Sequence, residues 1–127
     1  MSDVIDRIME RKSTHVSYLK DLFAAMQAKG FDNIRINDED LEPYSVEKDG
    51  AEAVIREMFQ LDDMVKLKAD WPRHSGDIPP YDEPYRVVLF FILCNEAHEA
   101  LADHTIPCEG VDEALSEIVN ELGEKYE

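Results

Sequence analysis

Four residues in the last third of the chain have side chains that zinc prefers. They follow the spacing Cys94-x3-His98-x5-His104-x3-Cys108, and two thiolates with two imidazoles suit a tetrahedral zinc ion. The spacing matches no familiar zinc module, however, and His104 and Cys108 could join the site only if the chain turned back sharply. Because Cys94 continues the apolar run of residues 87–94, we interpret it as a core residue and expect no metal or cofactor. A small zinc-binding or regulatory domain is the alternative.

Acidic residues recur along the last predicted helix, on the face opposite its apolar stripe. The acidic residues that we assign to partner binding are Glu113, Glu117, Glu121 and Glu124, with a second row of Glu96, Glu99 and Asp103. Carboxylates four residues apart lie about 6 Å apart along a helix axis, which is close to the phosphate spacing along a nucleic-acid strand. A partner's lysines and arginines would relieve the repulsion between such charges. A solvated face is the plainer interpretation, and the sequence leaves both open.

The proline-rich loop of residues 71–85 is a third candidate site. It contains Trp71, Arg73 and Tyr81, and aromatic residues and arginine dominate binding hot spots. Long loops on a rigid scaffold often carry function. The loop therefore suits either partner contacts or a ligand-binding module, unless its aromatic side chains only cover the core.

Motifs for catalysis are weak. His74 and Ser75 are neighbours in the chain, but a catalytic triad needs a spatial arrangement that adjacency does not supply. The five glycines are scattered and form neither a P-loop nor a dinucleotide-binding pattern. We therefore expect that the protein is not an enzyme.

The elements that position these residues are expected to be mainly helical. Apolar periodicity predicts helices over residues 2–29 with an interruption at 11–14, over 50–61 behind a capping box of Asp49 and Glu52, over 84–103, and from 111 to Gly123. Alternation predicts short strands at 31–37 and 64–71. Residues 87–94 alone would suit a buried strand, but good helix formers follow them, so we predict one central helix there.

The predicted fold is therefore mainly α, with an α+β fold as the second possibility. We expect residues 1–127 to form a single acidic globular domain, which is an ordinary length for one domain. Its core would be four helices, with at most a small two-stranded ribbon that pairs residues 31–37 with 64–71.

The charge balance narrows the class of partner. The chain has 29 acidic and 13 basic residues, for a net charge of -16. Ten acids and two bases fall in residues 37–63, and ten acids and one base in residues 95–127. Binding to nucleic acid requires lysine and arginine, and an anionic membrane is disfavoured for the same reason. We expect neither, although the exclusion is less secure for a local patch of Arg35, Lys66, Lys68 and Arg73.

Compartment and function follow from the same features. The N-terminus lacks the apolar region of a signal peptide, and two cysteines make no disulfide framework, so we expect a cytoplasmic protein. The sequence does not determine the oligomeric state. The charge and size predict a non-enzymatic interaction protein that binds and blocks a basic protein, such as a nucleic-acid-binding protein or nuclease complex. Inhibitors that mimic nucleic acid, anti-defence proteins of phages and immunity proteins that neutralise nuclease toxins share this charge and size.

Overall fold

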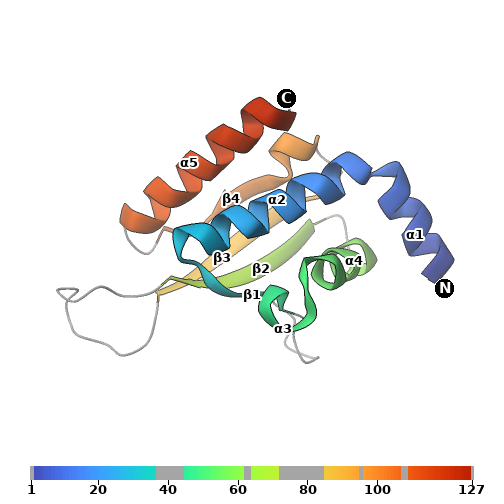
Figure 1. The fold of residues 1–127 in the computed structure, drawn as a ribbon, viewed down its shortest axis with the longest axis horizontal. Coiled ribbons are helices and arrows are strands. Elements are labelled where there is room, and N and C mark those ends of the chain that lie inside the picture. Colours follow the sequence, from blue (N-terminus) through green and yellow to red (C-terminus); the bar gives the residue numbers. More distant parts are fainter. Residues whose placement is uncertain are drawn as a thin grey trace.

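The computed structural model describes residues 2–36, 45–61, 64–71, 85–94, 96–106 and 109–126. Its elements in chain order are α1 (Ser2–Arg11), α2 (Ser13–Lys29), β1 (Asp32–Ile36), α3 (Val46–Asp49), α4 (Ala51–Leu61), β2 (Met64–Trp71), β3 (Tyr85–Ile92), the 3-10 helix η1 (Ala97–Glu99), β4 (Leu101–His104) and α5 (Glu109–Tyr126). The strands form an antiparallel sheet in the order β1-β2-β3-β4. Figure 1 shows α2, α4 and α5 on one face of this sheet.

The predicted four-helix core with a two-stranded ribbon is wrong. Residues 32–36 and 64–71 do pair, with Arg35 opposite Lys68, but β3 and β4 extend the sheet to four strands. The predicted central helix over residues 84–103 is instead β3, η1 and β4. The helix-forming residues among 95–103 do not extend into an α-helix. The described part of that segment has only one turn of 3-10 helix.

Burial alternates along the two central strands, as expected for a sheet that is covered on one face. In β3, Val87, Leu89 and Phe91 are buried, whereas Val88 and the other intervening residues are more exposed. In β2 the burial pattern alternates in the same way over all eight residues. The β-branched and aromatic residues of β3 fit such a pleated, half-buried surface. The sheet therefore has a core face against the helices and an outer face.

The helix boundaries confirm some predicted signals and correct others. The predicted interruption within residues 11–14 is confirmed, because Lys12 separates α1 from α2 and its ammonium donates to the carbonyl of Leu93 at 2.7 Å. The predicted stop at Gly30 is also confirmed, with the glycine in the left-handed region at φ 115°. Beyond Gly123, however, α5 continues to Tyr126.

The predicted capping box of Asp49 and Glu52 is replaced by a cap one turn earlier. The hydroxyl of Ser45 accepts the N–H of Lys48 at 3.1 Å. The carboxylate of Asp49 accepts the N–H of Ser45, also at 3.1 Å. Asp49 therefore closes the short helix α3 rather than opening α4.

Trp71 joins the end of the sheet to the helices. Its ring centroid lies 4.7 Å from that of Phe31, and the side chain is 8% exposed. A Cβ at Gly110, in the first turn of α5, would lie 3.3 Å from the indole, which is tighter than most Cβ contacts, so a larger residue there would require the indole or α5 to shift by a few tenths of an ångström.

Among the described helices, none combines the length and the apolar character that spanning a membrane requires.

The alternation in β3 predicts unequal costs for neighbouring substitutions. Leu89 is fully buried and Val88 is only partly buried. Leu89→Ala should lower the free energy of unfolding by about 2–5 kcal/mol, because it leaves a cavity in the core. Val88→Ala should cost about 1 kcal/mol or less, the usual scale for partly exposed sites. Urea denaturation measures both values, and equal costs would instead fit the helix that the sequence suggested.

Candidate functional site

The acidic surface of α5 is the main candidate site. The helix carries six acidic residues and one lysine. Its apolar residues, among them Val111, Leu115, Ile118 and Leu122, are buried. Because that stripe faces the core, the opposite face is turned to solvent. The exposed residues on it include Glu113, Glu117, Glu121 and Glu124.

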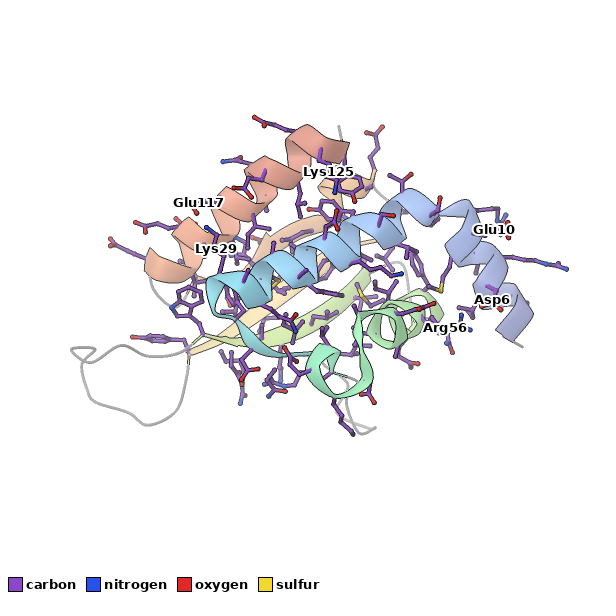
Figure 2. The ribbon with its side chains drawn as sticks, viewed as in Figure 1. Asp6, Glu10, Lys29, Arg56, Glu117 and Lys125 are labelled. Carbon is purple, nitrogen blue, oxygen red and sulfur yellow. The ribbon has the colours of Figure 1, made fainter. Side chains whose placement is uncertain are left out.

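Ion pairs within the helical layer engage the bases that lie near this surface. Lys29 of α2 pairs with Glu117, and Lys125 pairs with Asp21 of α2 at 2.7 Å. Figure 2 shows Lys29 next to Glu117, with Lys125 farther along α5. The α1–α4 contact repeats this arrangement, with Arg56 paired to Asp6.

Five of the six acids of α5 are left without such a partner among the described residues. Glu113, Glu121 and Glu124, like Glu109 and Asp112 in the first turn, form no ion pair with another described residue, and all five are exposed. The bases nearest to them are already engaged by other acids. This part of the surface therefore has excess negative charge.

The titration of the paired groups reflects this negative surface. The hydrogen bond with Glu117 raises the pKa of Lys29, and the charge of Glu121 acts in the same direction. The hydrogen bond with Asp21 likewise raises the pKa of Lys125. The pKa of Asp21 is lowered, first by the hydrogen bond from Lys125 and then by the one from Tyr126, whose hydroxyl lies 2.6 Å away.

The predicted second acidic row also lies next to α5, although not on a helix of its own. Glu96 precedes the 3-10 helix η1 and Glu99 is its last residue, and both are exposed. η1 packs against α5. Asp103 lies in β4 and lines a groove with α5. The structure thus brings the two predicted rows to neighbouring parts of the surface.

The outer face of the sheet has both bases and acids. Arg35 pairs with Asp70 there at 3.3 Å, and Asp32 lies opposite Asp70 in the register. Lys66 and Lys68 alternate with the buried residues of β2, and Arg35 lies opposite Lys68 in the register. Arg86 of β3 is exposed. Three residues of the predicted basic patch therefore share one face, whereas the fourth, Arg73, lies outside the described residues. The acids of α5 and the bases of the sheet lie on opposite sides of the molecule.

The predicted zinc ligands are not assembled in the part of the chain that the structure describes. Cys94 is exposed in the turn after β3, so its prediction as a core residue is wrong. His104 lies opposite Leu89 in the β3–β4 register, away from that turn. The side chain of His98 and all of Cys108 lie outside the description. Within the described residues, no group of three or more His, Cys, Asp and Glu side chains could hold a metal ion.

The predicted loop site has only its first and last residues described. Trp71 is buried against Phe31, so it offers little surface to a partner. Tyr85 packs against the edge of the core. Arg73 and Tyr81 lie outside the described residues, and their assignment to partner binding stays a prediction.

A groove between β4 and α5 was not foreseen from the sequence. It has a volume of about 340 Å³ and is lined on the α5 side by Ser116, Val119 and Asn120. The sequence analysis missed it because residues 101–104 were predicted to be helical. The signal that could have found it is the pair of uncharged polar residues on a helix whose other exposed positions are mostly acidic.

Comparisons of the chain with protein-family models, with curated proteins and with solved structures find no match. The arrangement of charge and the shape of the surface must therefore carry the functional interpretation. Chemically, the described surface suits the binding of cationic groups.

The lowered pKa of Asp21 predicts how the α2–α5 contact depends on pH. A carboxyl with a lowered pKa in the folded state adds stability above its unfolded pKa of about 3.9, and this is lost as the pH falls through the folded value. Asp21→Asn should therefore reduce the free energy of unfolding at pH 7. The difference from the unsubstituted protein should shrink below about pH 4.

The raised pKa of Lys125 gives the alkaline limit of the same contact. The contribution of Lys125 to the free energy of unfolding is complete below the pKa of about 10.4 in the unfolded state. It is lost as the pH rises through the pKa of Lys125 in the folded state. Asp112→Asn is the control, because it removes an exposed acid of α5 that makes no described ion pair. Urea unfolding of the three proteins across pH measures the effect. If Asp21→Asn cost as much stability at pH 2 as at pH 7, the contact would not be ionic.

Proposed function

We propose that the protein is a non-enzymatic interaction protein whose acidic α5 surface binds and blocks a basic surface of a protein partner. The partner would be a nucleic-acid-binding protein or a nuclease complex, and the protein would act in the cytoplasm. It would work as an inhibitor of the anti-defence, nucleic-acid-mimic or immunity type. Nucleic acid and anionic membranes would be repelled rather than bound.

The observation that carries this proposal is the unbalanced charge of α5. Glu113, Glu121 and Glu124 are exposed and form no ion pair with a described residue. Glu117, which pairs with Lys29, lies between Glu113 and Glu121, and with it the row has carboxylates on successive turns, about 6 Å apart along the helix. Such a row suits a surface that evolved to hold the phosphates of a nucleic-acid strand.

The separation of charge between the two sides of the molecule supports the same proposal. Acids cover α5, whereas Lys66, Lys68 and Arg86 lie on the outer face of the sheet. A field of this kind orients a charged partner before contact and raises the association rate. A basic partner would therefore approach the α5 side first.

The proposal predicts that binding depends on the unpaired glutamates Glu113, Glu121 and Glu124. A complex would first be captured with the tagged protein from an extract of the organism that encodes it, and a basic protein should be recovered. Glu113→Gln, Glu121→Gln and Glu124→Gln together should then slow association with that protein about tenfold or more, because rim charges act mainly on the association rate. Surface plasmon resonance measures the two rate constants separately.

The matched control removes the same amount of charge from the α1–α4 side. Glu10→Gln, Glu52→Gln and Glu57→Gln also change the net charge by three units, at residues of α1 and α4. This variant should associate at close to the unsubstituted rate. Equal slowing by both triple variants would mean that only the net charge matters, and the α5 surface would not be the binding site.

A further inference from the structure

The groove between β4 and α5 combines apolar walls with polar groups at its rim. Leu101 of β4 and Leu115 and Val119 of α5 provide the apolar part. Asp103, Ser116 and Asn120 also line the groove, and their side chains carry oxygen atoms that can accept hydrogen bonds. In the β3–β4 register Asp103 lies opposite Phe90, so its side chain starts from the outer face of the sheet at the edge of β4. The groove's volume of about 340 Å³ lies at the small end of ligand pockets, which span about 300–1,000 Å³. One long side chain and the backbone next to it would suit this space.

The carboxylate of Asp103 is held at the outer edge of β4. The N–H of Thr105 donates to Val88 of β3 at 3.0 Å. Backbone groups alternate in direction along a strand, so the N–H of the preceding His104 is turned away from β3. Asp103 Oδ1 accepts this N–H at 2.8 Å. The negative charge is therefore fixed at the edge of the strand, and the second carboxylate oxygen is available to another donor.

A second groove in the same molecule shows which group suits this combination. It lies between α1, α2 and α4, has the same volume of about 340 Å³, and is lined by Met9, Val16 and acidic residues. The guanidinium of Arg56 lines it, pairs with Asp6 and contacts the sulfur of Met9 at 3.8 Å. Here an arginine of the chain itself meets a carboxylate next to apolar side chains.

The β4–α5 groove has no such internal arginine, and its lining includes the ring of His104, whose Nδ1 lies 3.1 Å from the carbonyl oxygen of Thr105. Of its described lining residues, none is a lysine or an arginine. The bases that lie near α5, Lys29 and Lys125, are engaged by Glu117 and Asp21. The charge of Asp103 is thus left for a group from outside the described chain.

We propose that the β4–α5 groove holds an arginine side chain of the basic protein partner. The guanidinium would pair with Asp103 and donate to Ser116 or Asn120, and its methylene groups would lie along Leu101 and Val119. Arginine suits this site better than lysine, because its planar guanidinium offers several donors in fixed directions and is more weakly hydrated than an ammonium. This inference rests on the proposed function and names the residue that would anchor the partner.

The test uses a small probe and does not require the partner. N-acetylargininamide would be titrated into the ¹⁵N-labelled protein and followed by two-dimensional NMR, with N-acetylcitrullinamide as the uncharged control of nearly the same shape. The arginine probe should give saturable shifts at Leu101, Asp103, Ser116, Val119 and Asn120. The citrulline probe should bind about tenfold more weakly, because it lacks the charge that strengthens a hydrogen bond to a carboxylate.

Two variants and one control make the test specific for the groove. Asp103→Asn should weaken binding of the arginine probe about tenfold, and Asn120→Lys should abolish it by adding a cation at an exposed position of the groove. Asp32→Asn is the matched control, because Asp32 Oδ1 accepts the N–H of Asn33 at 2.8 Å, as Asp103 does for His104, but on the opposite edge strand. It should bind the probe as the unsubstituted protein does.

Equal binding of arginine and citrulline would overturn the proposal, as would shifts that spread along all the acids of α5. Unchanged binding by Asp103→Asn would overturn it too. These failures differ from a failure of the proposed function. Suppose that the α5 triple variant still associated slowly with the captured partner, but that the arginine probe did not bind the groove. The acidic surface would then remain the binding site, and the arginine anchor would be wrong.

Discussion

Burial of one face of the four-stranded sheet against α2, α4 and α5 is the constraint on which the other features of this protein depend. Leu67, Leu89 and Phe91 point to the helices from the central strands and are almost completely buried. The same contact turns the apolar stripe of α5 inward and its glutamates outward. It also leaves Lys66, Lys68 and Arg86 on the other face of the sheet, together with Asp70, which pairs with Arg35. The glutamates of α5 and these bases are therefore separated by the thickness of the fold.

The remaining negative charge reflects how the few bases of the helical layer are used. Lys29 and Lys125 tie α5 to α2 through Glu117 and Asp21, and Arg56 ties α4 to α1 through Asp6. Exposed pairs of this kind add little stability each, but they engage cations that would otherwise neutralise neighbouring carboxylates. Among the acids left without a described ion pair, those of α5 and of the edge of β4 lie on either side of a groove. That arrangement supports a surface for a basic partner better than an evenly acidic protein would.

Local signals in the sequence predicted some of this structure. The glycine at position 30, the interruption near Lys12 and the apolar stripe of α5 depend on neighbouring residues only, and all are present. The strand β3 was missed because a continuous apolar run fits a buried strand and a buried helix equally well. What decides between them is pairing with β2, more than a dozen residues away. The groove was missed for the same reason, whereas the acidic row of α5 needed only helical spacing.

Electrostatic attraction between α5 and a basic partner is the central claim, and the salt dependence of association tests it most directly. The association rate with the captured partner would be measured from about 20 mM to about 500 mM NaCl, a range over which the Debye length falls from about 20 Å to about 4 Å. The account predicts that the rate falls at least about tenfold over this range, with a smaller change in the dissociation rate. An association rate that stays constant between the two salt concentrations would contradict it.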